Sequence, residues 1–166
     1  TQKEKTLSVN VPAGVEEGTR IRLSGEGEVG AHNGTAGDLY IFLNIEEHPI
    51  FKREGPDIYC RVPLTISTAA LGGQVEVPTL GGGRARINIQ AGTQNGRQFR
   101  LRGKGMSVLR RSDRGDLYVE AAVETPVNLT KAQKKLLEEF SELVNDKNNP
   151  ESTGFFAKVK GLWEDL

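Results

Sequence analysis

The feature that most constrains the fold of this chain is an internal repeat. Residues 9–27 (VNVPAGVEEGTRIRLSGEG) align without gaps to residues 87–105 (INIQAGTQNGRQFRLRGKG), a shift of 78 positions. Eight of the aligned pairs are identical, and four of those are glycines. The same shift carries the string GDLY at residues 37–40 onto the GDLY at residues 115–118. Two matches in one register indicate that the chain holds two copies of one unit.

Both copies have the alternation of apolar and polar residues that is typical of half-buried strands. It occurs in LSVNVPAG and ARINIQAG, in RIRLSG and QFRLRG, and in the longer GDLYIFLNIEE and GDLYVEAAVE. The segments DIYCRVPLTI, QVEVPT and RARINI add strands to the second copy, and STAALGG predicts one helical turn closed by a glycine. We therefore predict a mainly β protein with two consecutive small β-sandwich domains, residues 1–48 and 49–128, joined near residues 47–57. Helices follow at residues 129–166.

One string, GEGEVG at residues 25–30, matches the glycine pattern of dinucleotide-binding turns. That function requires a helix directly after the glycines, so that the helix N-terminus meets the pyrophosphate. Here AHNGTAGD follows, which is unsuited to a stable helix, and the second copy retains only Gly103 and Gly105. We therefore interpret Gly25 and Gly27 as turn residues with positive φ.

Charge is balanced overall, with 22 basic and 22 acidic residues, which argues against a general nucleic-acid binder. Residues 1–50 hold four basic and eight acidic residues, whereas residues 84–114 hold nine basic and one acidic. Residues 1–50 and 84–114 are interpreted as two solvated faces of opposite sign, with a basic surface for an acidic partner as the alternative; the basic stretch includes the basic segment Arg97–Arg114, whose role stays open. Cys60 is the single cysteine, which excludes an internal disulfide and a cysteine-based zinc cluster. No apolar run is long enough to span a membrane.

The C-terminal segment predicts two helices. In NLTKAQKKLLEEFSELVND, Thr130 and Gln133 form a capping-box pattern, and the apolar residues make one stripe. After the loop KNNPEST, a second helical face is expected to hold Phe155, Phe156, Val159, Leu162, Trp163 and Leu166. This face docks either onto the chain's own β-domain or onto a second copy of the chain, and the dimer is the preferred interpretation.

The sequence shows no catalytic site. His32 lies in a glycine-rich loop with no ligand-like neighbours, and the proline after His48 indicates a turn. Neither a nucleophile–base set nor a phosphate-binding loop occurs. Asp38 and Asp116 recur in both copies at strand starts, where we expect a structural role. A repeated all-β chain with an associating tail favours a binding protein over an enzyme. One economical binding mode is the addition of an extended peptide as a strand at an exposed sheet edge.

These residues resemble a known family. The segments VNVPAGVEEGTRIRLSGEGEVG, HPIFKREGPDIYCRVPLTISTAALGG, VPTLGG, LRGKGM and RGDLYVEAAVETPVNLTKAQKKLLEEF are similar to the C-terminal region of bacterial DnaJ, a J-domain co-chaperone family. The resemblance covers nearly the whole chain. It implies two β-sandwich domains of DnaJ C-terminal type followed by a dimerising tail, which agrees with the prediction from the repeat.

The resemblance also implies a function and site residues. It implies a cytoplasmic homodimer that binds unfolded client polypeptides and delivers them to a DnaK-type heat-shock ATPase. In relatives a pocket on the first sandwich binds an apolar side chain of the client, and the matching positions here are Leu7 and Ile41. Phe155, Phe156, Val159, Leu162 and Trp163 match the dimerising tail.

The chain departs from the family pattern in two respects. The J-domain triplet His-Pro-Asp is missing, since His48-Pro49 is followed by Ile50, and the cysteine repeats that bind zinc are missing too. We therefore expect no cofactor in this chain and an incomplete first sandwich, without its opening strands. Two alternatives stay open: a structural dimerisation module with little peptide affinity, and a nucleic-acid binder that uses the basic segment.

Overall fold

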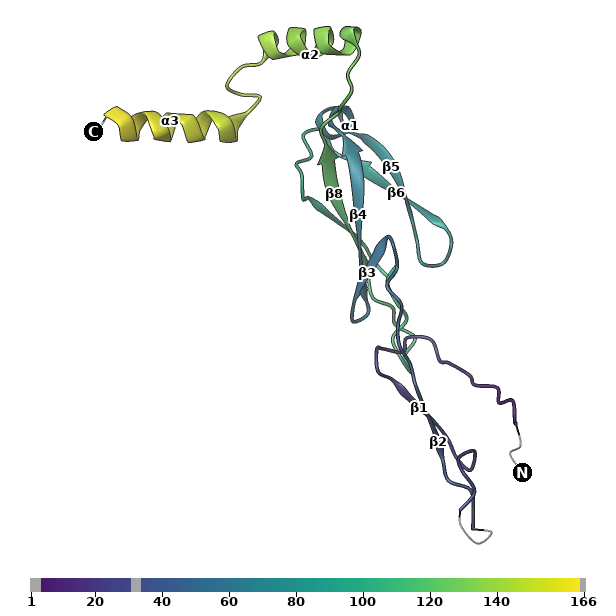
Figure 1. Ribbon diagram of the computed structural model, residues 1–166. Helices are drawn as coiled ribbons and strands as arrows, with labels where there is room; N and C mark the ends of the chain where they lie inside the picture. Colours follow the sequence, from purple (N-terminus) through teal and green to yellow (C-terminus); the bar gives the residue numbers. More distant parts are fainter. Residues whose placement is uncertain (1–3, 31–33, 165–166) are drawn as a thin grey trace. The chain divides into compact units, whose positions relative to one another are not determined.

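The computed structural model describes residues 4–30 and 34–164, and Figure 1 shows the order of its elements along the chain. His32 and Leu166 therefore lie outside the described residues. The contacts divide the chain into two compact units, residues 1–125 and 126–166. The first unit contains the strands and one short helix, and the second contains the two C-terminal helices.

The second copy of the repeat forms part of a β-domain, here called the second β-domain (residues 51–124). Its larger sheet has four strands in the order β3-β4-β8-β7: β3 (Phe51–Glu54), β4 (Asp57–Thr65), β8 (Leu117–Glu124) and β7 (Gln98–Leu101). The central pair β4 and β8 is parallel, and the outer pairs are antiparallel. A hairpin of β5 (Gly73–Pro78) and β6 (Arg84–Ile89) forms the other sheet.

The core of the second β-domain lies between these two sheets. Each central strand buries alternate side chains, as expected for strands with one face toward a core. The buried cluster combines residues of the larger sheet and of the hairpin: Ile58, Cys60, Leu64, Val77, Ile87, Ile89, Leu117, Val119 and Ala121. The predicted β-sandwich is confirmed here, and burial raises the pKa of the Cys60 thiol.

Helix α1 (Ile66–Leu71) leads from β4 into β5. Thr65 caps its N-terminus, because the Thr65 hydroxyl accepts a hydrogen bond from the Thr68 N–H. Gly72 ends it with a φ of 83°, a conformation that glycine adopts without strain. The single helical turn predicted from STAALGG is therefore confirmed.

The first copy of the repeat forms a much smaller structure, the two-stranded sheet of β1 (Arg20–Leu23) and β2 (Leu39–Phe42). Two expectations are wrong here. Residues 7–14 form no strand, and the long strand expected from residue 39 ends at Phe42. In the second copy the strand that matches residues 7–11 is β6, which pairs with β5. The shift of 78 residues places the counterpart of β5 before residue 1. Within this sequence, residues 7–11 therefore have no counterpart of β5 to pair with.

The repeated glycines have two separate roles. Gly25 and Gly103 have φ of 74° and 67°, as predicted for turn residues. Gly27 and Gly105 lack positive φ and instead lie against backbone, since a Cβ on either would lie 2.7 Å or less from the nearest atom. The prediction of positive φ is therefore wrong for this second pair, whose glycine is required by close packing.

The C-terminal unit contains α2 (Lys131–Leu143) and α3 (Pro150–Glu164). The capping box is confirmed: Gln133 N donates to the Thr130 hydroxyl and Thr130 N donates to the Gln133 side chain, at 3.2 and 2.8 Å. Helix α3 begins at Pro150, four residues before the expected start, because proline at the first helical position has a suitable φ and lacks only an N–H that the helix does not use. None of the described helices is long and apolar enough to cross a membrane.

Candidate peptide-binding sheet and helical tail

The β1–β2 sheet has one aliphatic face and one mixed face. Ile21 is paired with Ile41 and Leu23 with Leu39, and all four side chains are half-buried. Side chains alternate along a strand, so the opposite face holds the exposed residues Arg20, Arg22, Tyr40 and Phe42. The aliphatic face, defined by Ile21, Leu23, Leu39 and Ile41, is the one that could bind an apolar side chain.

The two predicted pocket residues lie on different segments. Ile41 lies in β2 on the aliphatic face, whereas Leu7 lies in the strand-free segment before β1 and is half-buried. An ion pair between Lys5 and Glu26, with Nζ and Oε2 2.5 Å apart, joins that segment to the loop after β1. The sequence analysis missed Ile21, Leu23 and Leu39 as partners of Ile41, although the alternation in RIRL and LYIF contained the signal.

Each copy of the repeat contains the same clasp between an aspartate, an arginine and a glycine. In the first copy Asp38 pairs with Arg22 at 2.7 Å and accepts from Gly25 N at 3.0 Å. In the second copy Asp116 accepts from Arg100 Nε at 2.6 Å and from Gly103 N at 2.8 Å. The clasp closes the turn onto the following strand, which is the structural role expected for both aspartates.

The hydrogen bond from Gly103 N and the Arg100 guanidinium hold the pKa of Asp116 below its ordinary value. A carboxyl whose pKa is lowered by folding stabilises the fold above its unfolded pKa, and that contribution is lost as pH falls through the folded pKa. We expect Asp116→Asn to lower Tm at neutral pH, and the difference from the unmodified protein to shrink as pH falls below about 4.

Asp113→Asn is the matched control for this prediction, because Asp113 pairs only with Arg111 on the exposed part of the same loop. Calorimetric scans of the three proteins at several pH values would measure both effects. An Asp116→Asn variant whose Tm deficit is constant between pH 7 and about pH 3 would contradict a role for the ionised carboxylate.

Most cations of the basic segment Arg97–Arg114 have partners within the chain. Arg100 pairs with Asp116 and Arg111 with Asp113. Arg114 donates to the Gly105 carbonyl and Arg97 to the Gln90 side chain, both at 3.0 Å. These contacts favour the interpretation of the segment as a solvated face with structural ion pairs.

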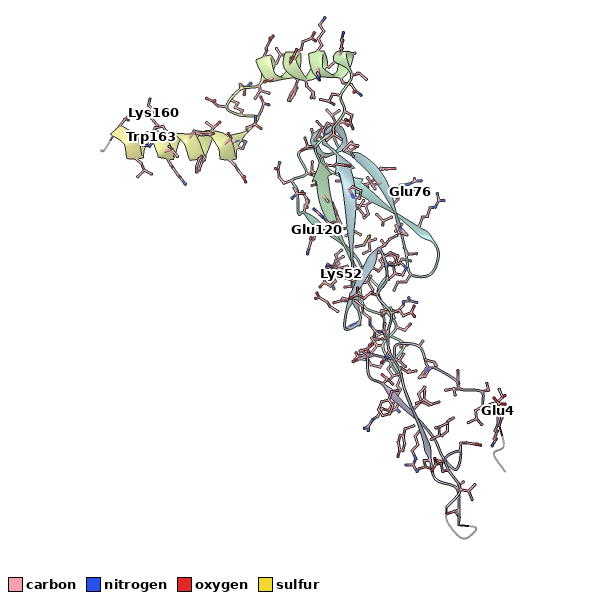
Figure 2. All side chains as sticks on the ribbon, viewed as in Figure 1. Glu4, Lys52, Glu76, Glu120, Lys160 and Trp163 are labelled. Carbon is pink, nitrogen blue, oxygen red and sulfur yellow. The ribbon has the colours of Figure 1, made fainter. Side chains whose placement is uncertain are left out.

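The predicted dimerisation residues lie on α3, which has no buried side chain among its described residues. Phe155, Phe156, Leu162 and Trp163 are 61–74% exposed, and the rings of Phe155 and Phe156 meet edge to face. Figure 2 shows Trp163 and Lys160 on this helix. Helix α2 also has an exposed apolar stripe that includes Leu136, Phe140 and Leu143. Exposed apolar surface on this scale is typical of an interaction site.

Together these features define a class: a tandem β-repeat protein without an evident catalytic centre in its described residues, followed by an apolar helical tail. The profile of the DnaJ C terminal domain matches residues 1–126, and that of the Chaperone protein DnaJ C-terminal region matches residues 132–165. The chain belongs to the DnaJ C-terminal domain family.

Curated relatives agree with these matches. The chain is 64% identical over 169 residues to a Chaperone protein DnaJ of Paramagnetospirillum magneticum, a match that covers 100% of this chain and 44% of the relative. It is 66% identical over 165 residues to the Chaperone protein DnaJ of Rhodospirillum centenum, covering 99% of this chain and again 44% of the relative. The chain therefore spans less than half the length of these proteins.

Proposed function

We propose that this chain is the substrate-binding and dimerisation part of a DnaJ-type co-chaperone. It binds unfolded or extended apolar polypeptide, and in the longer protein it delivers that polypeptide to a DnaK-type ATPase in the cytoplasm. It acts as a homodimer that is joined through α3. Binding requires no cofactor and no catalysis by this chain.

The observation that supports peptide binding most directly is the aliphatic face of a sheet with open edges. Among the described residues, β1 and β2 pair only with each other, so each strand has one edge with free backbone groups. An extended peptide that adds to such an edge gains main-chain hydrogen bonds, and its alternate side chains point toward the aliphatic face. The main-chain pairing gives affinity with little sequence preference, and the aliphatic face selects segments with apolar side chains.

The aliphatic face can be tested with single substitutions. We expect Ile41→Ser to weaken the binding of a fluorescent apolar peptide by about tenfold or more, since burying an aliphatic side chain is worth about 1.5–3 kcal/mol. Leu7→Ser is expected to act in the same direction. Fluorescence anisotropy titrations would measure the dissociation constants.

Phe42→Ser is the matched control, because Phe42 is the next residue in β2, is 65% exposed and lies on the opposite face. Equal affinity of the unmodified protein and the Ile41→Ser variant would favour the alternative, a dimerisation module with little peptide affinity. That alternative is supported by the absence of any fully buried side chain in the described part of residues 4–57.

A further inference from the structure

A cavity of about 760 Å³ lies within the first unit, between residues 16–17 and 45–48 on one side and the second β-domain on the other. Its apolar lining comes from five places in the chain. Ile45 precedes β3, Phe51 and Ile58 come from β3 and β4, Leu80 from the β5–β6 loop and Met106 from the loop after β7. The volume is in the range of sites that bind small molecules.

Hydrogen bonds hold the two sides of this cavity together. The Arg53 guanidinium donates to the carbonyl oxygens of Val15 and Gly14, at 2.6 and 3.4 Å, and to that of Gly55 at 2.8 Å. Within one side, Glu17 Oε2 accepts from the Ile45 N–H at 2.5 Å. Contacts of side chains with backbone thus hold the walls of the cavity in place, and Arg53 is the residue that joins its two sides.

The rim of the cavity is acidic. Five glutamates line it, Glu16, Glu17, Glu46, Glu47 and Glu54, against Lys52 and Arg53. In the part of the chain that the structure describes, none of the five lies within salt-bridge distance of a lysine or arginine. Figure 2 marks Lys52, the one lysine among the lining residues. A ligand with positive charge therefore meets an excess of uncompensated carboxylates.

A sheet edge borders the same cavity. Strand β3 is the outermost strand of the four-stranded sheet, and all four of its residues, Phe51–Glu54, line the cavity. The side of β3 that faces away from β4 has no strand partner among the described residues, although the Phe51 N–H of β3 already donates to His48 Nδ1 at 3.2 Å. An extended segment can pair with this edge and at the same time place a side chain against Ile45, Phe51 and Met106.

We infer that this cavity is a second polypeptide-binding site, specific for an extended segment in which one large apolar side chain is flanked by lysines or arginines. The apolar lining binds the central side chain, the β3 edge pairs with the backbone, and the glutamate rim selects the basic neighbours. Strands β1 and β2 themselves contain arginines but no acidic residue, so the two sites differ in the segments they prefer. The inference does not depend on binding at that face.

The chain has a built-in reporter for this site, because Met106 is its only methionine. The ¹³C-labelled methyl group of Met106 gives a single resonance, which we expect to shift on titration with a short peptide that has a central phenylalanine flanked by lysines. A peptide with glutamates in place of the lysines is expected to bind more weakly. Affinity for the lysine peptide should fall as salt is raised, since exposed charges are screened.

Two variants separate the apolar and the acidic parts of the site. Ile45→Ser is expected to raise the dissociation constant of the lysine peptide about tenfold. Glu46→Gln/Glu47→Gln is expected to raise it several-fold and to reduce its dependence on salt. Ile50→Ser is the control for the first variant, because Ile50 is 51% exposed in the same segment and does not line the cavity. Glu138→Gln/Glu142→Gln removes two charges from α2 and controls for the second.

The inference is overturned if the lysine peptide binds without shifting the Met106 resonance, or if Ile45→Ser and Ile50→Ser bind it equally well. It is also overturned if the lysine and glutamate peptides have equal affinity. Ile41→Ser distinguishes the two proposals. If the aliphatic face is the only site, Ile41→Ser weakens binding of the lysine peptide and Ile45→Ser does not. If the cavity is the site, Ile45→Ser weakens that binding and Ile41→Ser does not.

Discussion

Replacing Leu117 by alanine is expected to lower the free energy of unfolding of the second β-domain by about 3–5 kcal/mol. Leu117 has no exposed surface, and it lies at the start of β8 between its neighbours Ile58 of β4 and Leu101 of β7. Removing its side chain loses apolar burial and leaves a cavity that strands held on both sides cannot close. Domains of this size are stable by only about 5–15 kcal/mol in total, so the effect would be a large fraction of the whole.

Urea unfolding followed by circular dichroism would measure this change, and Cys60 offers an independent readout. Cys60 is 4% exposed in the same core, so its thiol reacts with a labelling reagent only when the core opens. Leu71→Ala is the control, because Leu71 is 80% exposed at the end of α1. Equal losses of stability in the two variants would mean that Leu117 is not a central core residue.

Replacing Phe156 and Trp163 together by serine is expected to reduce the mass in solution from twice 18.1 kDa to 18.1 kDa. An aromatic side chain buries about 150–250 Å² when it is covered, and each Å² of apolar area contributes about 25 cal/mol. Phe156 and Trp163 are 64% and 74% exposed, so most of this contribution is available to a second copy of α3. Light scattering over a range of concentrations would measure the mass.

Ala157→Ser/Glu164→Ser is the control for the tail, because each of these positions directly follows one of the two replaced residues in α3 and points about 100° away from it around the helix. The expected result is a dimer for the unmodified chain and the control, and a monomer for the aromatic variant. A monomer in all three would mean that the aromatic face docks onto the chain's own β-domain. A dimer in all three would place the association surface outside α3.

The parts of the fold that the sequence could predict are those with a local or repeated signal. The alternation in DIYCRVPLT and RARINI predicts β4 and β6, and Thr130 with Gln133 predicts the start of α2. The repeat predicts a structural role for Asp38 and Asp116 at equivalent strand starts, and both bond to the glycine of the preceding turn. Each of these depends on residues close in sequence or on direct comparison of the two copies.

The rest depends on which segments meet in space. The pattern LSVNV has the alternation of a strand, yet it forms none, because a strand needs a partner for its backbone. The parallel pairing of β4 with β8 is not encoded in either segment alone. The same holds for the candidate sites: the face shared by Ile21 and Ile41 follows from strand register, and the cavity at Met106 is assembled from segments far apart in the chain.

The parallel pair at the centre of the larger sheet also determines when this domain can form during synthesis. At the start of β4, the Asp57 carboxylate accepts a hydrogen bond from the backbone N–H of Asp116, which is 59 residues further along the chain. At about 5–20 residues per second, a ribosome needs about 3–12 s to add those residues. During that interval β4 lacks its backbone partner β8, and its apolar side chains are open to aggregation. For several seconds in each round of translation, the nascent chain is thus an extended apolar polypeptide of the kind that we propose the finished protein binds.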